Sequence, residues 1–432
     1  MVRRVDIALH VVAGLVLAAT APPDAHAQRV TGPFSGLFGA DKGQHTQAVD
    51  FRAGVGTTYD TGDGPDGVSA PDPGPRLSEN IITNLSYERN GDRAEFLVGG
   101  GTTVRQYADT QSRFVASHQL GSTLNARVTS KVTLAAAGGF NSAPFFLITP
   151  FAGWDGSWAA IVADEYGVVP EKNRTLDGAV TVTDQYAKRS NVGGSFSWRT
   201  TQFPSDAQAD VDIWTARGTF VYRFTRSLSF ESAFGREEAR YKLTSLPPIV
   251  NDMIDVGLEY GNEVPLARRI SFSFSVKPSM LRQTASTNFR LNGNAQMRRG
   301  FGRTWSSSLG YARSTEFVAG ITTPLFWDSL TASINGLLAT RVEWSARVGA
   351  AHGEEGSGLR GGVAEYTGTS RLTIGITHRM AAYGQFTYYH HEIPPGLTAF
   401  ELRSVIARQR VSAGITLWLP LATETRAPRD SR

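Results

Sequence analysis

The chain has 432 residues, of which 41% are hydrophobic and 19% charged, with 43 Lys and Arg against 39 Asp and Glu. It has no cysteine, which excludes disulfide bonds, thiolate metal sites, cysteine nucleophiles and a lipid-anchored lipoprotein. Its mean hydropathy of −0.21 is too low for a helical membrane protein of this length, and no run of Lys and Arg is dense enough to predict nucleic-acid binding.

The first residues, 1–27, have the features of a signal peptide. Two arginines precede an apolar segment, residues 7–21, which is too short to span a bilayer as a mature helix. Residues 25–27, Ala-His-Ala, fit a small–x–small cleavage site. We therefore expect Sec-type export, followed by a short periplasmic segment over residues 28–46. No later stretch contains the roughly 20 consecutive apolar residues of a transmembrane helix.

From residue 47 onward, apolar residues recur at every second position, which is the signature of β-strands. For example, Ile270, Phe272 and Phe274 alternate with serines. The alternating segments approach the ~9–11 residues that a tilted strand needs to cross a bilayer, and exceed the ~5–6 typical of soluble sheets. The predicted strands are 47–59, 77–89, 93–106, 112–128, 131–141, 175–187, 190–202, 209–224, 227–242, 251–262, 268–281, 284–298, 302–316, 325–340, 342–352, 360–377, 379–392 and 401–419.

The connections between these strands alternate in length. Short turns, such as residues 90–92 and 378–379, separate longer polar connections, such as residues 60–76 and 141–174. Outer-membrane barrels have short periplasmic turns and long outer loops. The pattern therefore predicts an all-β, transmembrane, antiparallel up-and-down β-barrel of about eighteen strands. We expect the barrel to cover residues 47–419, with both ends in the periplasm and a periplasmic C-terminal tail over residues 420–432.

Tryptophans lie near the ends of several predicted strands. Trp305 and Trp344 are expected at periplasmic ends, and Trp198, Trp214 and Trp327 near outer ends. This distribution is typical of the two aromatic girdles at membrane interfaces. The alternative is the ordinary enrichment of tryptophan in strands.

The last predicted strand ends in Ser-Ala-Gly-Ile-Thr-Leu-Trp-Leu, residues 412–419. Through Gly414, Leu417 and Leu419, this segment resembles the C-terminal signal of outer-membrane proteins, which the barrel-assembly machinery recognises. It differs in having leucine in place of the usual terminal aromatic residue and in the thirteen residues that follow. The mature chain resembles porin-like bacterial outer-membrane barrels in architecture, and this resemblance implies a passive channel.

The long connection 141–174 is unusually apolar for an outer loop. Its candidate constriction residues are Phe146, Trp154, Trp158, Asp164 and Glu165. The resemblance to porins implies a loop that folds into the pore, but a loop that caps the mouth or contacts a partner is an equal alternative.

Charged residues recur on the polar face of the predicted strands, which we expect to line the lumen. Bases outnumber acids in this set, so we expect a mild preference for anions. The candidate pore-lining residues are Arg105, Arg127, Arg199, Arg217, Arg223, Glu231, Asp255, Glu259, Lys277, Arg290, Glu343, Arg347, Arg408 and Arg410.

The sequence thus predicts a channel for passive diffusion of small hydrophilic solutes, with a mild preference for anions, in the outer membrane of a Gram-negative bacterium. One alternative is a barrel that exports a secreted polysaccharide. Another is a rim enzyme or surface binding protein, for which His390 and His391 are candidates. We expect no enzymatic activity, cofactor, metal or nucleic acid. The expected partners are outer-membrane lipid and lipopolysaccharide, the barrel-assembly machinery and the solute.

Overall fold

The structure is a computed structural model that contains eighteen β-strands. It describes residues 45–61, 76–107, 114–144, 172–203, 210–226, 228–242, 247–260, 270–283, 286–317, 324–355, 362–392, 394 and 405–425. The strands are β1 (His45–Asp60), β2 (Arg76–Asn90), β3 (Ala94–Tyr107), β4 (Phe114–Arg127), β5 (Val132–Pro144), β6 (Lys172–Ala187), β7 (Ser190–Gln202), β8 (Val211–Arg223), β9 (Leu228–Tyr241), β10 (Ile249–Tyr260), β11 (Ile270–Gln283), β12 (Ser286–Phe301), β13 (Trp305–Glu316), β14 (Leu325–Ala339), β15 (Val342–Glu355), β16 (Gly362–Gly375), β17 (Met380–Glu392) and β18 (Val405–Thr425).

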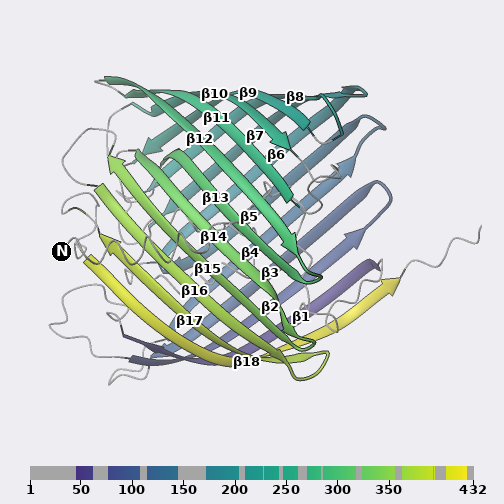
Figure 1. The fold of residues 1–432 in the computed structure, drawn as a ribbon, viewed down its shortest axis with the longest axis vertical. Helices are drawn as coiled ribbons and strands as arrows, with labels where there is room; N and C mark the ends of the chain where they lie inside the picture. Colours follow the sequence, from purple (N-terminus) through teal and green to yellow (C-terminus); the bar gives the residue numbers. More distant parts are fainter. Residues whose placement is uncertain are drawn as a thin grey trace, which may run out of the picture.

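The strands form one closed sheet in which each strand pairs antiparallel with its neighbours in the chain (Figure 1). The first strand, β1, pairs with β2 on one side and with β18 on the other, as in the register Val55↔Ile81 and Val55↔Ile415. Closure gives the first and last strands of the sheet a partner on both sides, which is the condition for a β-structure in lipid. The prediction of an eighteen-stranded up-and-down barrel is confirmed. Among the residues that the structure describes, no helix has the length and apolar character needed to cross a membrane.

The closing seam between β1 and β18 extends beyond the predicted strand ends. Gln47 pairs with Glu424, so β18 continues into what we expected to be the C-terminal tail. The register shifts between Val49 and Asp50, where Pro420 is the partner of Asp50. A proline has no N–H to donate to the ladder, and a bulge is where a sheet tolerates it.

The predicted short turns all occur at the barrel end that carries His45 and Thr425. Gly91 donates its backbone N–H to Ala94 O at 2.8 Å and closes the β2–β3 turn. Thr129 and Thr225 use their side-chain oxygens to accept the backbone N–H three residues further on. Such threonine-capped turns stabilise a hairpin at low cost because the side chain replaces a backbone acceptor. The predicted long connections lie largely outside the described residues, and so does the signal peptide.

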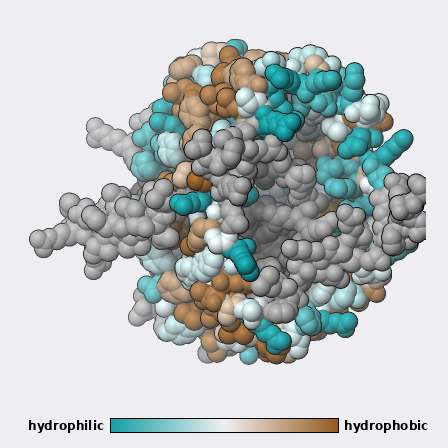
Figure 2. Space-filling model, turned by 45° about the vertical axis from the view of Figure 1, so that its right-hand side comes forward, coloured by the Kyte–Doolittle hydropathy of each residue, from teal (hydrophilic) through white to brown (hydrophobic). Residues whose placement is uncertain are grey.

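Large hydrophobic side chains point out of the barrel, whereas polar and charged ones point inward. On β1, for example, Val55 is 56% exposed while the neighbouring inward side chains Thr58 and Asp60 are buried. Figure 2 shows hydrophobic side chains gathered in patches along the outer wall, beside hydrophilic ones. This distribution is the reverse of a soluble protein and is typical of a barrel with lipid outside.

The tryptophans follow the girdle prediction with one exception. Trp305 and Trp344 lie on the outward face at the short-turn end, with ring centroids 6.1 Å apart. At the opposite end, Trp214 stacks on Phe196 with centroids 6.5 Å apart. Trp327 is 0% exposed, so its prediction as an outer girdle residue is wrong.

Candidate functional site

The lumen wall is the candidate site, because it gathers the charged side chains of the barrel. Alternate residues on every strand face inward, and the exposed hydrophobics fix which set faces outward. By this criterion the structure places all fourteen candidate pore-lining residues on the inward face. It does not bring them together in one site, because they are spread over ten strands from β3 to β18.

Four of these residues form a ladder of ion pairs across β8, β9, β10 and β11. Arg217 Nη2 lies 3.1 Å from Glu231 Oε1 and also contacts Asp255, whose side chain is only 10% exposed. Lys277 Nζ lies 3.6 Å from the same Asp255 carboxylate. Two bases and two acids therefore offset one another, so this part of the wall adds no surplus positive charge.

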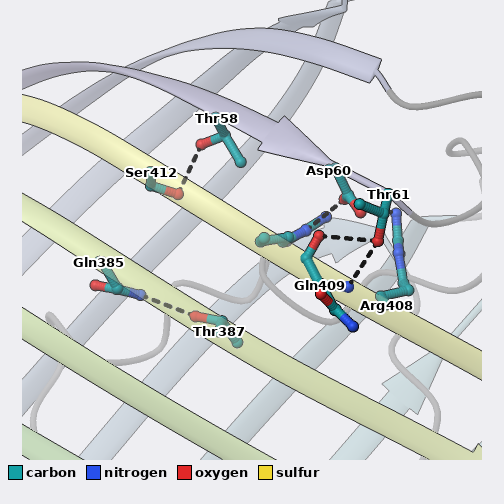
Figure 3. Close-up of polar contacts among 9 residues, drawn as sticks. Thr58, Asp60, Thr61, Gln385, Thr387, Arg408, Gln409 and Ser412 are labelled. Carbon is teal, nitrogen blue, oxygen red and sulfur yellow. Dashed lines mark hydrogen bonds and ion pairs between the residues drawn. The ribbon is translucent and has the colours of Figure 1, made fainter.

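A second cluster joins β1 to β18 near the end of the barrel opposite the short turns (Figure 3). Arg408 Nη2 donates to Asp60 Oδ2 at 3.1 Å, and Arg410 Nε donates to the same oxygen at 2.5 Å. All three side chains are at most 6% exposed. A buried charge is costly unless it is paired, so this carboxylate is what allows two guanidinium groups to lie side by side.

The other candidates are dispersed along the lumen. Arg105 is buried on β3, and Arg290 on β12 stacks its guanidinium 4.1 Å from the ring centroid of Phe326. Arg199 on β7 interacts electrostatically with Glu237 on β9. Arg347 is half-buried on β15. Four more lie near the short-turn end of the barrel, and these are Arg127, Arg223, Glu259 and Glu343.

The sequence analysis missed several inward acids. The predicted first strand ends at residue 59, whereas Asp60 is the last residue of β1. The register also brings Asp177 opposite Arg199, and Glu365 opposite His391, on the inward face. Glu237 and Glu316 face inward as well, as does one missed base, Arg371. All of these residues are predicted to face inward if the inward–outward alternation of side chains is extended to the last residue of each strand. The acids and bases of the described lumen are therefore nearly balanced, and the expected overall surplus of bases is much reduced.

The residues of the predicted assembly signal lie on both faces of β18. Leu417 is 37% exposed on the outward face, and Leu419 also points outward. Gly414 points inward, where the ring of Tyr383 from β17 lies across it and across Gly56 of β1. A side chain at either glycine would occupy the space of this ring.

Two other sets of candidates do not form a site in the described residues. The five constriction residues of the long connection lie outside the residues that the structure describes. His390 and His391 point to opposite sides of the wall, because neighbouring residues of a strand alternate. His391 is fully buried, whereas His390 Nε2 lies 3.1 Å from Glu392 Oε1 on the outward side.

These features define the chain as a porin-like membrane β-barrel in architecture. No protein-family model and no curated protein sequence matches the chain. Among solved structures, it is similar to OpdL of Pseudomonas aeruginosa, with 12% identity, a TM-score of 0.44, and coverage of 87% of this chain and 99% of that one. OccK7 (OpdD) of the same species has 12% identity, a TM-score of 0.45 and coverage of 87% and 100%. The siderophore receptor PirA of Pseudomonas aeruginosa has 10% identity, a TM-score of 0.39 and coverage of 85% and 80%. At these levels of similarity, the functional assignment depends on the lumen itself.

Proposed function

We propose that the protein is a channel for the passive diffusion of small hydrophilic solutes across the outer membrane of a Gram-negative bacterium, reached by Sec-type export. The observation that carries this proposal is the opposed character of the two faces of the closed wall. Large hydrophobic side chains such as Val55 and Phe234 point outward, while ionised side chains such as Arg217 and Asp255 point inward. Barrels of 16–18 strands are wide enough to leave an aqueous channel, which provides the hydration that such charges need.

We further propose a mild preference for anions that depends on local charge. The ladder around Arg217 is neutral, and the acids and bases of the described lumen are nearly balanced. Arg408 and Arg410 both bind the carboxylate of Asp60 on the lumen wall, and arginine stays protonated at any relevant pH. A fixed positive charge raises the local concentration of anions, but salt screens it over about 8–10 Å. The preference is therefore small and weakens as salt rises.

A liposome swelling assay tests the channel directly. Proteoliposomes that contain the refolded barrel should swell in solutions of small sugars, at rates that fall as the sugar becomes larger. Liposomes with heat-denatured protein are the control. A folded barrel that gives no swelling with any small sugar contradicts the proposal.

A further inference from the structure

Within the described residues, β12 and β13 separate from each other toward their outer ends. Their pairing runs from Phe301↔Trp305 only as far as Gly293↔Arg313. In contrast, β13 stays paired with β14 up to Glu316↔Leu325, and Figure 1 shows the ribbons of β12 and β13 diverging. The described ends of this hairpin, residues 314–317 and 324–327, are called here the β13–β14 tip.

Contacts on the inner surface of the wall show that the tip lies inside the barrel. The ring of Phe326 lies under the guanidinium of Arg290, and Asn292 Nδ2 donates to Thr315 Oγ1 at 3.0 Å. Both Arg290 and Asn292 point inward from β12. Phe326 and Phe317 also share one buried apolar cluster with inward side chains of β8, β9 and β11. These are Val211, Ala239, Tyr241 and Leu281.

Polar and aromatic contacts fix the tip further. Glu316 accepts a hydrogen bond from Ser314 Oγ at 3.0 Å and interacts electrostatically with Arg199 of the wall. The indole of Trp327 covers Gly353 of β15, where an added Cβ would come within 3.0 Å of it. Trp327 lies opposite Gly353 in the same series as Ser333 opposite the inward Arg347, so alternation itself places its indole on the lumen side and outside the predicted girdle.

We propose that the β13–β14 tip is a constriction that limits the size of the solutes that pass. This proposal rests on the proposed channel function and adds a size-determining element to it. Two packed β-layers lie about 10 Å apart, so a hairpin against the inner wall removes about that much from the width of the lumen. Phe317 and Phe326 are the residues that hold it there, because their burial against β8–β11 keeps apolar surface out of the water of the lumen.

The first test removes the apolar anchor. The double substitution Phe317→Ser and Phe326→Ser should release the tip, raise single-channel conductance at least twofold and admit larger sugars in the swelling assay. Phe326→Leu keeps the apolar contact and is the matched control, with conductance close to that of the unmodified protein. A folded double variant with unchanged conductance and size limit would overturn the proposal. A folded unmodified barrel that does not conduct at all would instead overturn the channel function.

A second test leaves the anchor intact and so does not depend on folding of the double variant. The chain has no cysteine, so a single cysteine can be labelled selectively. Ser314 and Arg313 are neighbours on β13 that face opposite sides of the wall, and Arg313 is 46% exposed on the outward side. A bulky thiol reagent on Ser314→Cys should reduce the current, whereas the same label on Arg313→Cys should not. Equal effects of the two labels would contradict a tip in the path of the solute.

Discussion

Substitution of Gly414 by alanine should weaken the seam that closes the barrel. An ideal Cβ at Gly414 would lie 2.9 Å from Tyr383 Cε1 and closer still to the backbone oxygen of Val55. The tyrosine ring cannot move freely, because the guanidinium of Arg371 lies 4.2 Å from its centroid. Overpacking of this kind costs about 1–3 kcal/mol. We expect the upper end of this range, since a rotamer change of Tyr383 does not relieve the contact with the Val55 backbone.

A glycine on the adjacent strand provides a matched control. A Cβ at Gly384 meets no atom within 4 Å. Alanine there should be neutral or stabilise the barrel by about 0.5–1 kcal/mol, the usual advantage of alanine over glycine inside a strand. The free energies of unfolding of Gly414→Ala and Gly384→Ala, measured by urea unfolding with tryptophan fluorescence, should therefore differ by about 3–4 kcal/mol. Equal stabilities would refute the packing of Tyr383 across the seam.

Three further predictions follow from the topology and the charges. Single cysteines at Gly64 and Gly91 should differ in intact cells, with surface labelling at Gly64 and none at Gly91; labelling at Gly91 would contradict the assignment of short turns to the periplasm. Asp60→Asn removes the carboxylate between two arginines, so the reversal potential in a salt gradient should move toward anions; a move toward cations would contradict the inward position of this cluster. Deletion of residues 146–169 should raise conductance if that connection narrows or covers the lumen, and a folded variant with unchanged conductance would argue against this role.

The number and order of the strands could be predicted because each strand carries its own alternation. The apolar series Ile270, Phe272 and Phe274 specifies one face of β11 without reference to any other strand. Turn residues such as Thr129 act locally as well. The strand order of such a barrel can therefore be predicted from the sequence, because every strand has one polar and one apolar face.

The functional site was harder to predict from the sequence. It depends on the exact residues at which strands end and on a hairpin end that leaves the barrel wall. The predicted first strand is one residue shorter than β1, so the sequence does not predict that the Asp60 carboxylate binds Arg408 and Arg410. The inward position of the β13–β14 tip could not be predicted from the sequence for a different reason. Alternation continues through it unchanged, so the local pattern carries no sign that Phe326 leaves the lipid-facing wall.

The most direct test of the channel is the single-channel conductance of the refolded, unmodified protein in a planar lipid bilayer. Folding is verified beforehand by resistance of the barrel to unheated detergent on a gel. We predict discrete conductance steps that rise with potassium chloride concentration, with a weak anion preference that fades as salt rises. A correctly folded barrel that produces no steps above the bare bilayer would contradict the account.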